Sequence, residues 1–214
     1  MTRNRFMVTV GLTILSLLLS VSSALAQYIA AQAFATKEVY HAKGVKAYIW
    51  TAVQPSGWNP GIASPLGVCT TNPPCTGSFF ETGFAKGTVT GNVLQQYVAY
   101  TLPDGQTANR FLDNLSDNTW YAFQSSYNTP LHRWQAFRYG VVKFTAPSLA
   151  FEDGFMVACG GEGGGPGIPM AVECNSTQYQ SQAGTWSLYN YSGTQGNYCV
   201  YKPYDYGSVS WGPC

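Results

Sequence analysis

The residue whose type and surroundings most suggest chemistry is Glu81. Two phenylalanines, Phe79 and Phe80, precede it, and Phe84 lies three positions after it. Apolar surroundings disfavour the charged form of a carboxyl group and therefore raise its pKa. A carboxyl group that keeps its proton in mildly acidic solution can act as a general acid. Glu81 is therefore the candidate catalytic residue.

A structural role for Glu81 is the competing interpretation. Side chains alternate between the two faces of a strand, so Phe80 and Thr82 can point into a core while Glu81 faces the other way. Glycosidic hydrolysis needs a pair of carboxyl groups. Most of the other acids lie beside Gly, Asn or Pro, where short acids bond to their own backbone in turns. The sequence therefore identifies no partner for Glu81.

Other signatures of catalysis or metal binding are absent from the sequence. His41 and His132 are far apart and form no H-E-x-x-H motif, so no zinc site is expected. The glycine-rich segment 160–167 lacks the ending of a phosphate-binding loop, and we interpret it as a tethered loop, or alternatively as a flap over a groove. The segment 113–118 offers several oxygen ligands that could hold calcium, but it lacks EF-hand spacing and is interpreted as a turn. We predict no metal and no cofactor.

The cysteines predict a disulfide-stabilised domain. An even number of cysteines in an exported chain indicates disulfides, although the sequence alone does not fix the pairing. We favour pairs of consecutive cysteines because each pair closes a short loop. The six cysteines in these pairs are Cys69 with Cys75, Cys159 with Cys174, and Cys199 with Cys214.

Residues 1–26 have the pattern of a secretory signal peptide. Arg3 and Arg5 precede an apolar run, and Ala24-Leu25-Ala26 resembles a cleavage site. The run is shorter than the roughly 20 apolar residues that cross a membrane. We predict a secreted, extracellular protein with no membrane span after cleavage, an uncleaved anchor being the alternative. Residues 27–214 fit one domain with its own core.

The composition favours strands and excludes nucleic acid as a partner. Without Arg3 and Arg5, nine basic residues stand against ten acids, so no basic surface is expected. Glycine, tyrosine and tryptophan are abundant, which suits strands and tight turns. Residues 27–44 show no clear period and are predicted to be a short helix or an irregular lead-in. The proline-rich segment 54–77 is predicted to be a long loop.

Alternating apolar and β-branched residues predict an all-β domain. The turn at Pro103-Asp104-Gly105 separates two of the expected strands. No apolar period of 3.6 residues persists for three turns, so helices are not expected. The predicted strands cover 45–53, 78–86, 93–102, 118–127, 132–139, 141–145, 155–159, 185–191, 197–202 and 208–211.

Aromatic and amide side chains are the candidate ligand-binding groups. Flat rings with polar edges can stack on sugars, and we expect exposed rings in the proline-rich loop and in the tail. The Gly77–Gly105 segment is predicted to form the middle of a groove-forming sheet. The candidate binding residues are Tyr97, Gln95, Trp58, Tyr204 and Tyr206.

The run from Trp120 to Gly140 carries a family resemblance. The pattern W-Y-A-F followed by R-W-Q-A-F-R-Y-G resembles adjacent strands of concanavalin A-like domains, including laminin G-type modules. The resemblance implies an antiparallel β-sandwich of the jelly-roll type. It covers about 25 residues and favours the jelly roll over other sandwiches.

A second resemblance is to the glutamic peptidases, which share the concanavalin A-like fold. Phe80-Glu81-Thr82-Gly83 resembles their L-Q-T-G strand, and the segment from Tyr97 to Pro103 resembles their A-W-Y-E-W-Y-P strand. In that family a glutamine and a glutamate form the catalytic pair. Glu81 stands where the glutamine would be, and Thr101 stands where the glutamate would be. Threonine cannot act as a carboxylate does.

The sequence therefore favours a secreted, non-catalytic module that recognises glycans or another extracellular surface through a concave β-sheet. One alternative is a secreted hydrolase, glutamic peptidase-like or active on polysaccharides, that uses Glu81. A structural cell-surface or matrix protein is the second alternative.

Overall fold

The computed structural model describes residues 31–51, 62–71, 75–163, 172–188, 193–196, 199–201 and 209–212. In this part of the chain the regular structure is β-strand, with one short 3-10 helix, η1 (Thr88–Thr90). No helix in the described ranges is long and apolar enough to span a membrane. The predicted signal peptide, residues 1–26, lies outside them.

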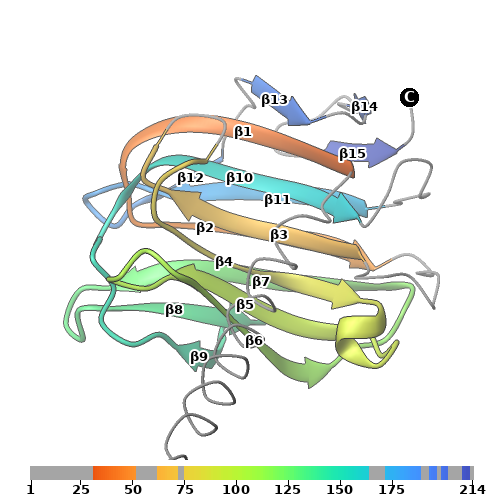
Figure 1. Ribbon diagram of the computed structural model, residues 1–214. Helices are drawn as coiled ribbons and strands as arrows, with labels where there is room; N and C mark the ends of the chain where they lie inside the picture. Colours follow the sequence, from red (N-terminus) through yellow and green to blue (C-terminus); the bar gives the residue numbers. More distant parts are fainter. Residues whose placement is uncertain are drawn as a thin grey trace, which may run out of the picture.

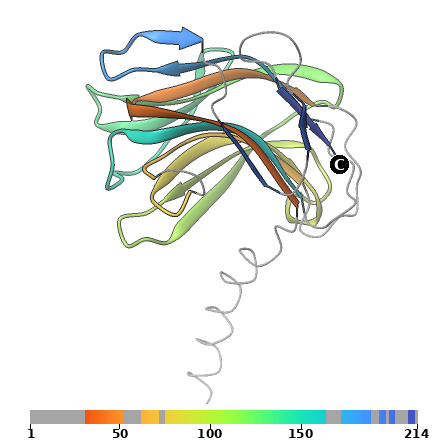
Figure 2. The same cartoon turned by 90° about the horizontal axis from the view of Figure 1, so that it is seen from above.

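The strands form two antiparallel sheets that pack against each other (Figure 1, Figure 2). The seven-stranded sheet has the order β13-β1-β10-β3-β4-β5-β6, and the eight-stranded sheet has the order β14-β15-β11-β2-β7-β8-β9, with β12 paired to β11. The first sheet consists of β1 (Ala31–Ala42), β3 (Ile62–Cys69), β4 (Phe79–Lys86), β5 (Gln95–Thr101), β6 (Thr107–Asn114), β10 (Gly154–Gly163) and β13 (Gly193–Gly196). The second consists of β2 (Gly44–Thr51), β7 (Thr119–Asn128), β8 (Arg133–Arg138), β9 (Val141–Thr145), β11 (Val172–Gln180), β12 (Trp186–Leu188), β14 (Cys199–Tyr201) and β15 (Val209–Gly212).

An aromatic core joins the two sheets. Phe80 and Phe84 of β4 are fully buried between them, as is Trp134 of β8. The rings of Phe80 and Trp134 stack with centroids 5.5 Å apart. The indole Nε1–H of Trp134 donates to the carbonyl oxygen of Phe151 at 3.0 Å, so its polar edge is satisfied inside the core. This packing fixes which face of β4 points inward.

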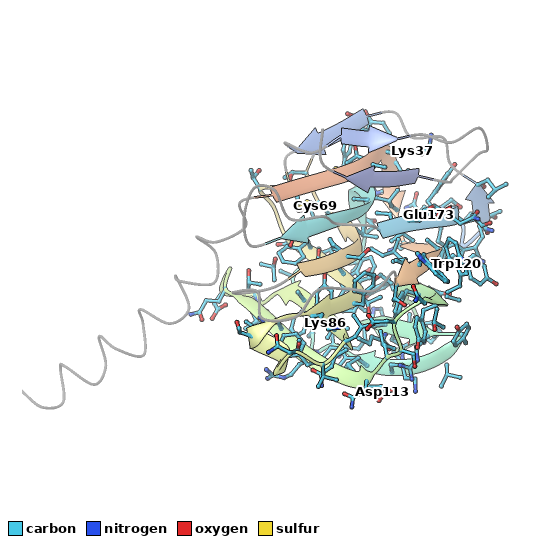
Figure 3. The ribbon with its side chains drawn as sticks, turned by 90° about the vertical axis from the view of Figure 1, so that its right-hand side faces the viewer. Lys37, Cys69, Lys86, Asp113, Trp120 and Glu173 are labelled. Atoms are coloured by element: carbon cyan, nitrogen blue, oxygen red, sulfur yellow. A yellow bond between two sulfur atoms is a disulfide. The ribbon has the colours of Figure 1, made fainter. Side chains whose placement is uncertain are left out.

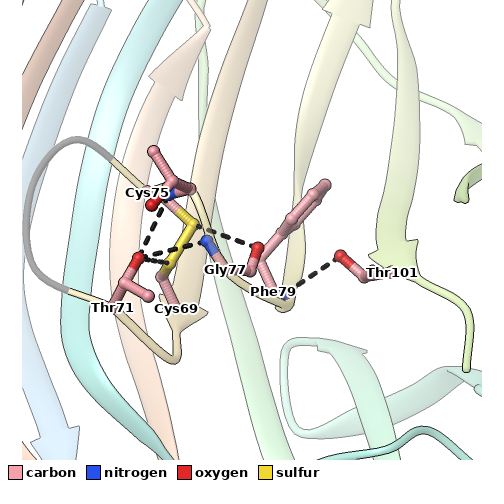
Figure 4. The surroundings of a disulfide bond; sticks show 7 residues. Cys69, Thr71, Cys75, Gly77, Phe79 and Thr101 are labelled. Atoms are coloured by element: carbon pink, nitrogen blue, oxygen red, sulfur yellow. Dashed lines mark hydrogen bonds between the residues drawn. A yellow bond between two sulfur atoms is a disulfide. The ribbon is translucent and has the colours of Figure 1, made fainter. Parts of the chain in front are cut away.

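Two of the predicted disulfides are present. Cys159 of β10 and Cys174 of β11 are fully buried, and their bond links one sheet to the other. Cys69 and Cys75 close the connection between β3 and β4, where the hydroxyl of Thr71 accepts hydrogen bonds from the amides of Thr76 and Gly77 (Figure 4). The predicted Cys199–Cys214 pair lies outside the described side chains.

The prediction for residues 27–44 is wrong where the structure describes them, because Ala31–Ala42 forms β1. This strand pairs with β10 on one side and with β13 on the other. Its small and polar residues gave no two-residue period. Pairing with two strands, rather than local propensity, makes this segment a strand.

The loop predicted for residues 54–77 is also wrong in part, because β3 lies inside it. Pro65 has no amide hydrogen, and the pairing between β3 and β10 is interrupted at Ser64 and Pro65. The hydroxyl of Ser64 donates to the carbonyl oxygen of Gly160 at 2.9 Å and so supplies a hydrogen bond at this interruption. A proline is therefore tolerated inside a sheet.

The other predicted strands are confirmed in the ranges that the structure describes, and several of their ends there differ by a few residues. The turn at Pro103-Asp104-Gly105 is also present, and Gly105 has φ +84. β6, β11 and β13 were not predicted. β10 is longer than predicted, because residues 160–163 of the supposed glycine-rich loop continue the strand and pair with β1.

The disulfide between the sheets should contribute more stability than the disulfide in the loop. Replacing Cys159 and Cys174 by alanine opens a loop of 15 residues and is expected to lower the free energy of unfolding by about 3 kcal/mol. Replacing Cys69 and Cys75, which are 6 residues apart, should lower it less. Urea denaturation of both double variants tests this, and an equal or larger loss in the second variant would contradict it.

Candidate functional site

Glu81 lies on the outer face of the seven-stranded sheet, which points away from the eight-stranded sheet. Its neighbours Phe80 and Thr82 are fully buried in the sandwich, so strand alternation turns Glu81 outward. Gly67 of β3 and Ala99 of β5 stand opposite it in the two flanking strands. The position of this carboxyl group is thus set by the packing of the phenylalanines beside it.

Tyr97 of β5 holds the Glu81 side chain. Its hydroxyl donates to Glu81 Oε1 at 3.0 Å, and only 6% of the tyrosine is exposed. Tyr97 pairs with Gly83 of β4, two residues after Glu81. Burial is the main cause that raises the pKa of Tyr97 well above its ordinary value, so the hydroxyl keeps the proton that it donates.

A second carboxyl group, Glu162 of β10, lies on the same face. Glu162 pairs with Ala63 of β3, and Glu81 pairs with Gly67 of the same strand. Ala63 and Gly67 are four residues apart and therefore share one face of β3. Register thus places both carboxyl groups on the outer face, with β3 between their strands.

The two carboxyl groups interact electrostatically. Burial and, next, the charge of Glu162 raise the pKa of Glu81 from 4.5 to about 8, against the opposing effect of the Tyr97 hydrogen bond. Glu81 therefore carries a proton in acidic and neutral solution and can donate a hydrogen bond. A neutral acid beside a second carboxyl group can support general acid–base catalysis.

Small residues surround the pair. A Cβ atom on Gly67 would lie 2.7 Å from the Cβ of Glu81, so glycine leaves the space that the glutamate occupies. Ala63, Ala85 and Ala99 form a small apolar cluster with Tyr97 on this face. The sheet surface around the carboxyl groups therefore consists of small, apolar residues, which favours the neutral form of Glu81.

The sequence prediction included Glu81 and Tyr97 but missed Glu162. Glycines around Glu162 lower strand propensity, and the segment was interpreted as a loop. The alternation of side chains along a strand could have indicated the outward position of Glu162. Cys159 pairs across the core, and Glu162 lies an odd number of residues after it, so an extended strand turns the glutamate to the opposite face.

The other predicted site residues have different positions. Gln95 lies in β5, and its amide Nε2 donates to Asn114 Oδ1 at 2.9 Å, near the edge strand β6. Thr101 accepts a hydrogen bond from the amide of Phe79 at 3.2 Å, which is a structural contact (Figure 4). The other three candidate binding residues lie outside the described residues: Trp58, Tyr204 and Tyr206.

The two histidines, distant in sequence, contact neighbouring acids. His41 Nδ1 is 3.1 Å from Asp153, and His132 Nδ1 is 3.5 Å from Glu152. Among the described residues, no group of three or more His, Cys, Asp or Glu side chains could hold a metal ion. These contacts tie β1 and the turn between β7 and β8 to the β9–β10 connection.

The acids of the segment 113–118 are engaged in ion pairs. Asp113 lies 2.6 Å from Arg138 and 2.8 Å from Lys143, which joins the edge strand of one sheet to strands of the other. Asp117 lies 3.2 Å from Lys86. The segment leads out of β6, where Asp113 and Asn114 are the last residues, into the connection to β7.

Comparison with known proteins identifies structures with a similar fold. No family model matches the sequence, and no curated protein matches it. Scytalido-glutamic peptidase with a peptide-based transition-state analogue is similar in structure, with a TM-score of 0.63, 11% sequence identity, and coverage of 86% of this chain and 98% of that chain. SCP-B, a member of the eqolisin family of peptidases in complex with the tripeptide Ala-Ile-His, has a TM-score of 0.58, 12% identity, and coverage of 86% and 98%.

The likeness shows the fold and leaves the activity to be argued from the residues. The chain is a disulfide-stabilised, concanavalin A-like jelly-roll β-sandwich, and that prediction from the sequence is confirmed.

The raised pKa of Glu81 makes the stability of the fold depend on pH. Between pH 4.5 and about 8 the carboxyl group is ionised in the unfolded chain but protonated in the folded one. The free energy of unfolding should therefore fall as the pH rises through this window, by at most a few kcal/mol. Glu81→Gln should flatten that fall. Urea denaturation across the window measures it.

The exposed Glu38 of β1 provides a matched control, because Glu38→Gln removes a carboxyl group without touching the pair. It should keep the pH dependence of the wild type. An unchanged slope in Glu81→Gln would show that the folded protein does not hold a proton on Glu81.

Proposed function

We propose that this chain is a hydrolase that cleaves peptide bonds with the carboxyl groups of Glu81 and Glu162. The observation that carries the proposal is the register that places both carboxyl groups on one face of the sheet, where burial and, next, the charge of Glu162 raise the pKa of Glu81. The fold shared with peptidases that bind peptide-like ligands supports a peptide as the substrate.

The two carboxyl groups have different tasks in this proposal. Glu81 keeps its proton up to about pH 8 and donates a hydrogen bond to the oxygen of the scissile carbonyl group. Glu162 acts as the general base and takes a proton from the attacking water. The negative charge of Glu162 disfavours ionisation of Glu81 and so adds to the effect of burial. Tyr97 positions Glu81 through its hydroxyl.

The resemblance to glutamic peptidases fits this assignment for Glu81. It places Glu81 where the catalytic pair of that family has glutamine. A protonated carboxyl group and a primary amide are both planar groups that donate and accept hydrogen bonds. A neutral Glu81 can therefore replace glutamine. Glu162 supplies the second group from β10, so the threonine at position 101 does not remove the chemistry.

The chain is also proposed to be secreted. The disulfides Cys69–Cys75 and Cys159–Cys174 support this, because disulfides form and persist in oxidising compartments. The signal-like residues 1–26 and the single domain predicted for 27–214 agree with export.

A second candidate function is a non-catalytic module that binds a glycan or another extracellular surface through the same outer face. Its support is Thr101, which stands where the resemblance expects the catalytic glutamate and makes a structural hydrogen bond. A protein that retains a polymer without cleaving it would have this function.

Three substitutions separate the roles in peptide hydrolysis. Glu162→Gln should lower kcat by about 100-fold or more, because it removes the general base. Glu81→Gln should stay within about tenfold of the wild type in acid and keep its activity above pH 8, where the wild type loses the proton of Glu81. Glu81→Leu should lose activity as Glu162→Gln does. Mass spectrometry of a peptide mixture across pH 3 to 9 measures the products.

Glu38→Gln serves as the control, because it removes an exposed carboxyl group of β1 and should leave turnover unchanged. Full activity in Glu162→Gln, or no peptide cleavage by any form of the folded protein, would refute the proposal. Retention of a peptide or polysaccharide without turnover by wild type and Glu162→Gln alike would favour the second candidate.

A further inference from the structure

The outer face of the eight-stranded sheet carries a set of aromatic rings. In β2, Val45, Ala47 and Ile49 are buried in the core, so alternation turns Tyr48 and Trp50 to the outside. Register then places neighbouring rings on the same face of the flanking strands. We call this set the aromatic face, and it consists of Tyr48, Trp50, Trp120, Phe137 and Trp186.

Two rings of the aromatic face adjoin each other across neighbouring strands. Trp50 of β2 pairs with Trp120 of β7, and their ring centroids are 5.5 Å apart at an interplanar angle of 48°. Tyr48 is 49% exposed, and both tryptophans are partly exposed. The hydroxyl of Tyr139 donates to the carbonyl oxygen of Trp120 and braces the strand end.

Neutral polar groups lie between the rings. Gln124 pairs with Phe137, Asn175 pairs with Tyr48, and Gln178 pairs with Lys46. The charged side chains at these register positions are Lys46, which is positive, and Glu173, which is negative. Figure 3 shows Glu173 and Trp120 on the same side of the molecule. The ammonium group of Lys46 lies 4.4 Å from the centre of the Trp186 ring, so the two side chains form a cation–π interaction.

This composition specifies the chemistry of a partner. Aromatic faces carry partial negative charge and attract the weakly positive C–H groups of a pyranose ring, and amide side chains exchange hydrogen bonds with its hydroxyl groups. A balanced charge gives no attraction for an acidic or a basic polymer. A protein partner would instead be expected to bring an apolar core to such a patch.

We propose that the aromatic face binds a neutral polysaccharide of linked hexoses. The surface lies on the sheet opposite Glu81 and Glu162, so binding there does not depend on the proposed hydrolysis. Such a site would hold the protein on a glycan surface while the outer face of the other sheet stays accessible.

Affinity electrophoresis of the full chain in gels that contain hydroxyethyl cellulose, barley β-glucan or galactomannan tests the proposal. At least one of these neutral polymers should retard the wild type, and Trp50→Ala and Trp120→Ala should each weaken binding about tenfold. Trp50→Phe keeps a ring and should keep part of the binding. Circular dichroism confirms that each variant is folded.

Two controls separate this surface from the rest of the molecule. Tyr40 is 74% exposed on β1 of the other sheet, and Tyr40→Ala should bind as the wild type does. Glu81→Gln and Glu162→Gln should also bind fully, even if the hydrolase proposal fails. Polygalacturonate, an acidic polymer, should retard the protein less than the neutral ones.

The proposal is overturned if none of the three neutral polymers retards the protein, or if the tryptophan variants bind as well as the wild type. It is also overturned if size-exclusion chromatography shows a dimer that Trp120→Ala dissociates, since a second copy would then cover the aromatic face. Equal loss of binding in Tyr40→Ala would likewise refute this location.

Discussion

The burial of Phe80 and Phe84 between the sheets is the constraint on which the candidate functional face depends. The two rings pack in the core, Phe80 against Trp134 of the other sheet, and strand alternation then directs Glu81 outward. A shift of β4 by one residue would bury the carboxyl group and expose the rings, so the register is strongly favoured. Hydrophobic burial therefore positions a polar group that contributes nothing to the core.

Small residues complete the site at the expense of strand propensity. Gly67, Gly83 and the glycines around Glu162 are poor strand formers, yet each lies in a strand. Gly67 leaves room for Glu81, and Gly83 could not carry a side chain because a Cβ atom would overlap the carbonyl oxygen of Ser64. Pairing with neighbours on both sides stabilises strands that would not form alone. The buried disulfide Cys159–Cys174 holds β10 to the other sheet.

The sequence predicted the elements whose own residues favour strands and missed those that depend on neighbours. Alternating apolar residues identified β4, β5, β7 and β8, and with them Glu81 and Tyr97. Ala31–Ala42 and Ile62–Cys69 became strands through pairing on both sides, and proline at position 65 argued locally for a loop. Glu162 was missed for the same reason, since glycines hid the strand that carries it. An electrostatic interaction between residues 81 apart in sequence cannot be predicted from either segment alone.

The surroundings of Glu81 also bear on the role proposed for it. A lone exposed glutamate would be ionised at neutral pH and would accept hydrogen bonds without donating them. Burial and the neighbouring charge keep the proton on Glu81, while the Tyr97 hydroxyl occupies one of its oxygens. The other oxygen can then present that proton to a ligand. The chemistry of this position follows from its surroundings, because the same side chain on a solvated strand would be an ordinary anion.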